Sequence, residues 1–413
     1  MRVSTHLRRT SWTLLDQGVV SLGTFLLNIV LARHLSPAEY GTFALVLGTL
    51  LLVQVITSSL VFYPMSIRSA AMAAGDRPRL IGRSLALLGL LGVPLILIVG
   101  AGLAVMGRTE LLFPLLAYFV AWQTQEALRR SLFAEFRHRD ALVGDIVGYI
   151  GPVLVVLFLL QRGPLVLTDV FLGLSLASMA ALAVTYLQTR PDFRDLASLR
   201  VTIREFWSLG RWSLANNLTG ASRIQIMLWG LTALFGAAAT ASFQAALNVI
   251  NLANPVLLGL CNVIPQAAAQ KFRDGYGTAW QAARVYARLG AAPILLCYGV
   301  LLAAPEFVLH ILYGANSAYI GLVLPIRILA VGWLLGYMAD MVCSYMHGVD
   351  AARLALLINA VGAISAAALF LPLTISHGIA GSCIALAVSS LARLIASQWI
   401  LTRMIADDRR SVA

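Results

Sequence analysis

Charged residues are scarce in this chain of 413 residues: Asp, Glu, Lys and Arg make up 12% of it, against 60% hydrophobic residues. A soluble domain carries about 25% charged residues, so this composition excludes an ordinary soluble protein. The apolar runs are continuous rather than alternating, which predicts membrane-spanning helices and not a barrel of strands. The lipid bilayer is therefore the expected surroundings of most of the chain.

Residue types for catalysis and metal binding are also few. The four cysteines have no metal-ligand spacing, and we expect free, buried thiols. The six histidines form no ligand set, so no metal or cofactor is predicted. There is no G-x-x-x-x-G-K-[ST] segment and no loop large enough for a catalytic domain. These absences exclude an ATPase and argue against a membrane enzyme such as a polymerase or glycosyltransferase.

What the chain does contain is a series of twelve apolar stretches. A helix needs roughly 20 residues to cross a bilayer, and each stretch is long enough. The sequence therefore predicts an all-α integral membrane protein with twelve transmembrane helices. The stretches cover residues 11–33, 41–66, 82–106, 111–129, 141–161, 165–188, 211–234, 241–265, 284–304, 318–345, 353–375 and 379–402.

Basic residues gather on one side of these stretches. The N-terminus and the even-numbered loops hold 24 of the 30 Lys and Arg residues, whereas the odd-numbered loops hold only Arg33, Arg108 and Arg162. By the positive-inside rule, both termini are expected in the cytoplasm. Attraction to anionic lipid explains the net charge of +12, and no nucleic-acid partner is predicted.

The longest linker divides the chain into two halves. Residues 1–188 are expected to form an N-terminal lobe, residues 189–210 a cytoplasmic linker and residues 211–413 a C-terminal lobe. Apolar residues recur in the linker at helical spacing with arginines between them, which predicts a basic amphipathic helix on the membrane surface; a plain solvated loop is the alternative. The apolar residues are Phe193, Leu196, Leu199, Ile203 and Phe206.

The two halves also resemble one another in sequence when they are shifted by 200 residues. Both are expected to begin on the cytoplasmic side, which predicts a parallel repeat: two pseudo-symmetric six-helix lobes with a substrate cleft between them. Because such a chain makes its own cleft, we expect a monomer. The matched residues include Trp12 and Trp212, Asp16 and Asn216, Gln17 and Asn217, Leu31 and Leu231, and Phe43 and Phe243.

Three arginines, Arg223, Arg327 and Arg393, lie inside apolar stretches of the C-terminal half. A charge at the centre of a bilayer costs on the order of 3 kcal/mol, so such a residue normally faces a cavity or a partner. Guanidinium groups suit bidentate contact with phosphate, and we expect a cationic wall for an anionic substrate. Pairing with a residue such as Asp340, or snorkelling, is the alternative. The N-terminal half has no arginine at the expected midplane, so the cationic wall is expected on one side only.

Amides form a second polar feature. Gln244, Asn248, Asn251 and Asn254 follow one another at helical spacing and therefore share one stripe. Because amides are costly against lipid, the stripe is expected to bond sugar hydroxyls or to hold helices together. The predicted substrate-binding residues are Arg223, Arg393, Arg327, Asn216, Asn217, Gln17, Gln244, Asn248 and Asn251.

Acidic residues at membrane depth are the candidates for ion coupling. A site for a coupling proton or Na⁺ needs a carboxylate, and Asp16 and Asp340 are the predicted ones. Glu126 lies four residues before Arg130, which predicts an ion pair near the cytoplasmic end of a helix. Asp145 is expected to open the fifth helix, also near the cytoplasm.

One segment carries a family resemblance. Residues 28–43 read NIVLARHLSPAEYGTF. This segment resembles the junction of the first two helices in polysaccharide-biosynthesis flippases, where the pattern is LAR-x-L-(S/G)-P-x-(E/D)-(Y/F)-G. Those flippases belong to the multidrug/oligosaccharidyl-lipid/polysaccharide (MOP) exporter superfamily, whose members are similar to this chain in length and topology. Lipid II flippases of that superfamily usually have fourteen helices, whereas twelve are predicted here.

The resemblance implies a transporter that works by alternating access in the bacterial inner membrane. Its substrate would be an undecaprenyl-pyrophosphate-linked oligosaccharide for exopolysaccharide or O-antigen synthesis, and a polysaccharide polymerase or export complex would be its partner. Cavity arginines of such flippases hold the pyrophosphate, a role open to Arg223 and Arg393. The alternative is a drug or organic-cation antiporter of the same superfamily, for which Asp16 and Asp340 would be the cavity acids.

Overall fold

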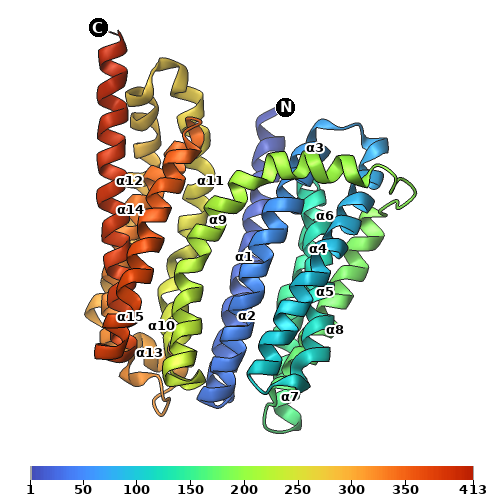
Figure 1. Cartoon of the computed structure of the whole chain (residues 1–413), viewed down its shortest axis with the longest axis vertical. Helices are drawn as coiled ribbons and strands as arrows, with labels where there is room; N and C mark the ends of the chain where they lie inside the picture. Colours follow the sequence, from blue (N-terminus) through green and yellow to red (C-terminus); the bar gives the residue numbers. More distant parts are fainter. Residues whose placement is uncertain (1, 413) are drawn as a thin grey trace. The chain divides into compact units, whose positions relative to one another are not determined.

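The computed structural model describes the backbone of residues 2–412 and the side chains of residues 12–408 except 13, 14 and 74. Within these residues every regular element is a helix (Figure 1), which confirms the prediction of an all-helical membrane protein. The first half contains α1 (Arg2–His34), α2 (Pro37–Thr57), the π-helix η1 (Ser58–Phe62), α3 (Tyr63–Ala71), the 3₁₀-helix η2 (Ala74–Asp76), α4 (Arg77–Val105), the 3₁₀-helix η3 (Thr109–Leu111), α5 (Leu112–Ala134), α6 (His138–Asp145), the π-helix η4 (Ile146–Ile150), α7 (Gly151–Arg162) and α8 (Leu167–Thr189).

In the second half, α9 runs without interruption from the predicted linker into the predicted seventh helix. Short 3₁₀-helices separate several of the longer elements that follow. The elements are α9 (Leu199–Phe235), α10 (Ala237–Ile250), η5 (Asn251–Ala253), α11 (Asn254–Lys271), η6 (Phe272–Asp274), α12 (Tyr276–Ala303), α13 (Pro305–Tyr313), η7 (Ile320–Leu322), α14 (Val323–Gly348) and α15 (Ala352–Val412).

Nine segments of the described chain are long and apolar enough to cross a membrane. The sequence predicts twelve crossings, and the difference lies in three helices. The last segment, in α15, contains two of the predicted crossings, while α5 and α9 are absent from the nine because polar residues lower their hydropathy. The polar residues include Gln123, Gln125, Glu126 and Arg129 in α5 and Asn216, Asn217 and Arg223 in α9. The number of crossings stays a prediction.

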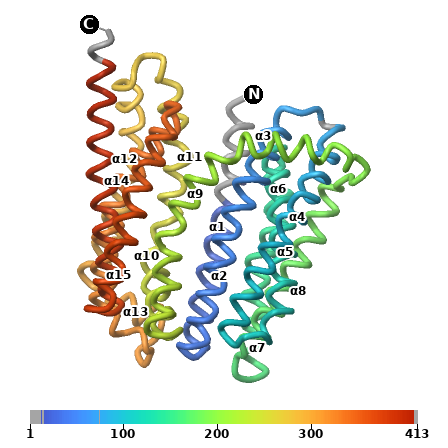
Figure 2. The backbone as a smooth tube through the Cα atoms, in the orientation of Figure 1, coloured from blue at the N-terminus to red at the C-terminus, as the bar shows by residue number. Residues whose placement is uncertain are grey.

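α15 consists of two helices joined at Gly378. This residue has φ 57° and ψ −135°. These angles lie outside the helical region, and residues with a Cβ atom rarely adopt them. In Figure 2 the tube of α15 turns back on itself between its two helices. The hydroxyls of Thr374 and Ser382 lie 2.9 Å apart across the turn. The loop predicted at residues 376–378 is therefore confirmed as a turn of minimal length.

The segment that carries the family resemblance begins α2. Ser36 precedes the helix with extended backbone, and its hydroxyl accepts a hydrogen bond from the Glu39 backbone N–H at 3.3 Å, while Pro37 opens the helix. The Glu39 carboxylate in turn accepts bonds of 3.1 and 2.9 Å from Arg108. Arg108 also bonds Glu110 at 2.6 Å, and this bond lowers the pKa of that exposed carboxyl group. Arg108, a basic residue on the side predicted to be extracytoplasmic, thus fixes the start of α2.

The chain forms two compact units. Unit 1 contains residues 1–39 and 46–218, and unit 2 contains residues 40–45 and 219–413. The short segment 40–45 near the start of α2 therefore belongs with the C-terminal helices. In unit 2, Tyr40 and Phe43 are fully buried, and Tyr40 lies against Tyr319 with ring centroids 6.2 Å apart.

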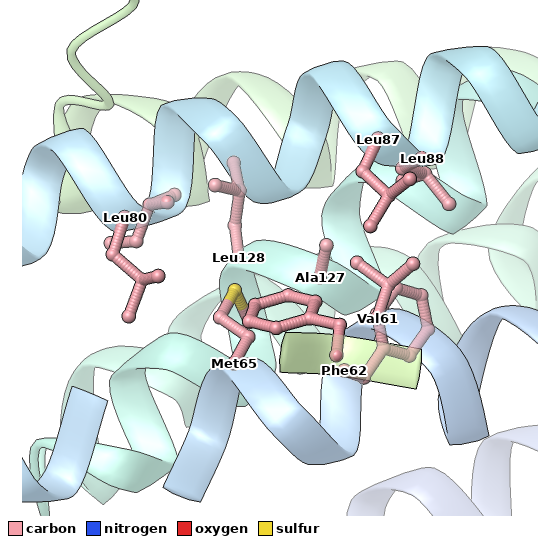
Figure 3. Packing of buried hydrophobic residues seen from close by; sticks show 10 residues of the cluster. Val61, Phe62, Met65, Leu80, Leu87, Leu88, Ala127 and Leu128 are labelled. Atoms are coloured by element: carbon pink, nitrogen blue, oxygen red, sulfur yellow. The ribbon is translucent and has the colours of Figure 1, made fainter. Parts of the chain in front are cut away.

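Buried hydrophobic residues at one end of unit 1 hold four segments together. Phe62 and Met65 come from η1 and α3, Leu80 from α4 and Leu128 from α5, and Figure 3 shows their side chains in one cluster. Phe206 of α9 joins the same cluster and is 1% exposed. α9 therefore buries Phe206 in protein, while Ile203 on the same helix is exposed. The predicted amphipathic helix begins only at Leu199, and the exposed Phe193 and Leu196 lie before it, outside any helix.

Candidate functional site

Two of the three predicted arginines meet in unit 2. Arg393, in the second helix of α15, is 5% exposed, and its Nη2 donates to Asp340 Oδ1 at 2.6 Å and to Asn359 Oδ1 at 2.9 Å. Arg223, in α9, is half-buried, and its Nη1 donates to Ser389 Oγ at 3.3 Å. We call Arg223 and Arg393 the arginine pair. Helices α9, α14 and α15 thus place two cations and one carboxylate in one cluster.

Gly362 provides the space in which the arginine pair converges. A Cβ atom at this position would lie 2.5 Å from both Cγ and Cδ of Arg393 and 3.2 Å from Nη1 of Arg223. Ser389 also bonds here, because its hydroxyl donates to the Gly362 carbonyl at 2.7 Å. Any side chain at position 362 would therefore displace Arg393. The glycine is a steric requirement of the pair, which the sequence alone does not reveal.

The charges of this cluster do not balance. The arginine pair carries two positive charges, and Asp340 contributes one negative charge through its bond to Arg393. The Arg393 side chain is 7% exposed, whereas that of Asp340 is 30% exposed. Nε of Arg393 is buried and has no hydrogen-bond partner within the described part of the chain. A cluster with excess positive charge and an unused buried donor is chemically suited to an anion with several oxygen acceptors.

The amide stripe of α10 makes contacts within unit 2. Gln244 Nε2 donates to Asn248 Oδ1 at 2.9 Å, and Asn248 Nδ2 donates to the Tyr40 hydroxyl at 2.7 Å. Asn251 lies at the end of α10, where its carbonyl accepts the backbone N–H of Asn254. These bonds favour the helix-joining interpretation of Gln244 and Asn248 over direct contact with a sugar.

Three further predicted substrate residues, Gln17, Asn216 and Asn217, belong to unit 1, whereas the arginine pair belongs to unit 2. Gln17 belongs to unit 1 and bonds Ser21 at 3.3 Å. Asn217 Nδ2, also in unit 1, donates to Ser59 Oγ at 3.2 Å and to Ser213 Oγ at 3.1 Å. Asn216 is half-buried one residue before it.

Arg327 is exposed, and its Nε donates to the Leu302 carbonyl at 3.0 Å. This carbonyl belongs to the last turn of α12, where helix carbonyls lack intrahelical partners and cationic groups are favourable. The contact gives Arg327 a helix-capping role.

Unit 1 contains a buried arginine that the sequence reasoning misses. The hydropathy pattern assigns Arg129 to a cytoplasmic loop, but this residue is 6% exposed in α5. Its guanidinium bonds Asp16 at 2.9 Å, Glu126 at 3.2 Å and, by a very short contact, Asp145. The sequence does not predict this burial. The physical reason is that hydropathy ends the predicted helix at residue 129, whereas α5 continues to residue 134.

Three carboxylates therefore surround Arg129, and two of them have further contacts. Glu126 also accepts a 2.7 Å bond from Arg130, as its spacing predicts, and Asp145 accepts one from Gln125 at 3.2 Å. Oδ1 of Asp16 is buried and has no hydrogen-bond partner among the side chains that the structure describes. The sequence signal for this cluster is the grouping of Gln125, Glu126 and Arg129 in one apolar stretch, because such residues require partners inside the protein.

A sequence model of the polysaccharide biosynthesis protein family matches residues 6–269, more than half of the chain. The chain belongs to this family. No curated protein matches the chain in a sequence search.

Solved structures share the fold across almost the whole chain. An inward-facing multidrug resistance MATE family transporter of the MOP superfamily gives a TM-score of 0.75 at 15% identity, over 97% of this chain and 100% of the other. The lipid II flippase MurJ, in an inward closed conformation, gives 0.73 at 9% identity, over 96% and 87%. A MOP superfamily transporter from Pyrococcus furiosus gives 0.68 at 14% identity, over 96% and 95%. The protein is a multi-pass membrane protein with the MATE-like fold of two six-helix lobes.

Proposed function

We propose that the protein is a flippase that moves undecaprenyl-pyrophosphate-linked oligosaccharide repeat units across the bacterial inner membrane. The cargo serves exopolysaccharide or O-antigen synthesis and passes from the cytoplasmic to the outer leaflet by alternating access. Membership of the polysaccharide biosynthesis family supports the chemistry of this cargo. The protein acts as a monomer and hands the cargo to a polymerase or export complex.

The observation that carries the proposal is the arginine pair over Gly362. The two guanidinium groups have one carboxylate partner among the described residues, so the cluster has an excess of one positive charge. A pyrophosphate presents several oxygens at the spacing that guanidinium groups bind bidentately. Arg223 and Arg393 therefore bind the pyrophosphate group, and the flexible glycan extends beyond them.

Topology and ion coupling complete the proposal. Twelve crossings, with both termini and the 189–210 linker in the cytoplasm, place the even-numbered loops against anionic lipid. Asp16 and Asp340 remain the candidates for ion coupling. Each is bonded to a buried arginine, at 2.9 Å to Arg129 and 2.6 Å to Arg393, so the arginine has to move away before the carboxylate can bind a coupling ion.

Flipping by purified protein in proteoliposomes tests the role of the arginine pair. Arg223→Ala and Arg393→Ala are compared with wild type, using a fluorescent polyprenyl-pyrophosphate oligosaccharide, with Arg327→Ala as the matched control. Each arginine of the pair contributes one charge-assisted contact, so its loss is expected to slow flipping about 10- to 100-fold. Arg327→Ala, which loses an exposed backbone contact, is expected to flip at a rate near that of wild type. Undiminished flipping in the first two variants would contradict the assignment.

A further inference from the structure

Arg393 has more contacts within the protein than its carboxylate partner Asp340 has. Gly362 lies against its aliphatic stem, and Asn359 accepts a 2.9 Å bond from the same Nη2 that bonds Asp340. Asp340 is attached to Arg393 by one oxygen, and its side chain is 30% exposed against 7% for Arg393. The carboxylate is thus able to leave while the guanidinium stays in place.

Arg393 also retains unused binding capacity. Its Nε is buried and has no hydrogen-bond partner among the described residues. The Cys343 thiol is near the guanidinium, but sulfur is a weak acceptor. A buried donor without an acceptor is costly, and a bound ion or water is one of the explanations for such a group in a native protein.

We propose that Asp340 is a tethered competitor for the anionic group of the cargo, occupying Arg393 when the site is empty and yielding it when the cargo binds. This inference rests on the proposed function, because it takes the arginine pair as the anion site. An uncompensated buried guanidinium is strongly destabilising. The carboxylate therefore stabilises the empty transporter, and the phosphate oxygens take its place in the loaded one.

The surroundings of Asp340 determine what happens to the displaced carboxylate. The charged and titratable groups that face it are Arg223 from α9, Cys261 from α11, Tyr298 from α12, Cys343 from α14 and Arg393 from α15. The thiols and the phenol are uncharged at neutral pH, and both arginines face the anion once it is bound. A bound anion therefore repels the Asp340 carboxylate and favours its protonation, by formation of an O–H bond with a proton from solvent.

Two consequences follow for binding. First, the tethered carboxylate weakens anion binding, because it is present at high effective concentration beside Arg393. Second, protonated Asp340 no longer competes, so acid strengthens anion binding, and binding and proton uptake promote one another. The same competition assists release, since Asp340 regains Arg393 as the cargo leaves.

Binding of radiolabelled sulfate to the purified full-length protein in detergent tests the inference. Sulfate remains a dianion across the pH range in which the protein is folded, so any pH dependence comes from the protein. Asp340→Asn is expected to bind sulfate about tenfold more tightly than wild type at neutral pH. Wild-type binding should tighten on acidification, and that of Asp340→Asn should not.

Matched variants separate competition from a loss of structure. Asp274→Asn removes an exposed carboxylate that pairs with Lys271 at 3.7 Å, and it should bind sulfate as wild type does. Asp340→Glu keeps a tethered carboxylate and should restore the pH dependence. In the flipping assay, Asp340→Asn should lower both KM and kcat, because tighter binding slows release.

Two different failures are distinguishable. If Asp340→Asn elutes as a folded monomer and binds sulfate no more tightly than wild type, Asp340 only orients Arg393 and the competitor role is wrong. If neither wild type nor Asp340→Asn binds sulfate or inorganic pyrophosphate, the arginine pair is not an anion site, and the proposed function loses its support.

Discussion

At the scale of single residues, buried arginines organise both units in different ways. Arg129 in unit 1 is surrounded by the three carboxylates of Asp16, Glu126 and Asp145. Arg393 in unit 2 has one carboxylate and shares its surroundings with a second arginine. The first cluster has excess negative charge and the second has excess positive charge. Only the second therefore suits an anionic cargo.

Removal of Arg129 is expected to destabilise the protein severely. Arg129→Met would leave three buried carboxylates without their shared partner, which costs about 3–5 kcal/mol. Arg130→Met is the matched control, because Arg130 contacts the same Glu126 but its side chain is 45% exposed, and an exposed pair contributes about 0–1 kcal/mol. The measurement is the apparent unfolding temperature of the purified protein in detergent. Similar losses in both variants would show that Arg129 is not the organising charge.

The sequence predicts the arginine pair but not its setting. Arg223 and Arg393 are recognisable because a charge inside an apolar run is rare. The sequence does not show that the two side chains lie close together. Their proximity depends on the space at Gly362 and on long-range contacts such as the Arg223–Ser389 bond, which joins residues 166 positions apart. The burial of Arg129 escapes sequence reasoning for the same reason, because its Asp16 partner is 113 positions away.

At the scale of elements, most helix positions follow from hydropathy, and the turns between them follow from local chemistry. The start of α2 is predictable from Ser36 and Pro37, which cap and open a helix. The turn at residues 376–378 is predictable from the polar break between two apolar runs. What hydropathy cannot predict is the unbroken course of α9 from Leu199 to Phe235, because the burial of Phe206 in unit 1 depends on tertiary contacts.

The turn at Gly378 is expected to require glycine. Gly378→Ala forces a Cβ atom onto backbone with φ 57° and ψ −135°, at a cost of about 1–3 kcal/mol. Gly299→Ala is the control: Gly299 lies inside α12, and a Cβ atom added there would have no neighbour within 4 Å. There, alanine should stabilise the helix by up to about 1 kcal/mol. Apparent unfolding temperatures in detergent should therefore fall for the first variant and hold or rise for the second.

At the scale of the whole molecule, the family and the fold are both known, but neither identifies the cargo. The cargo has to be inferred from the residues of the site. The family match assigns the chain to the polysaccharide biosynthesis protein family, and the solved structures assign it the MATE-like fold. Solved proteins with this fold include a multidrug transporter and a lipid II flippase, so the fold alone does not select a cargo. The competing assignment, an organic-cation antiporter, draws on Asp16 and Asp340, each of which is bonded to a buried arginine. The arginine pair favours the anionic cargo.

The most direct measurement compares the two cargoes in the same preparation. Wild-type protein is reconstituted in proteoliposomes, and transport of a fluorescent polyprenyl-pyrophosphate oligosaccharide is followed beside efflux of a fluorescent organic cation, with and without proton and Na⁺ gradients. The account predicts translocation of the anionic lipid and no protein-dependent movement of the cation. Export of the cation without lipid flipping under any gradient would contradict it and would establish the antiporter assignment instead.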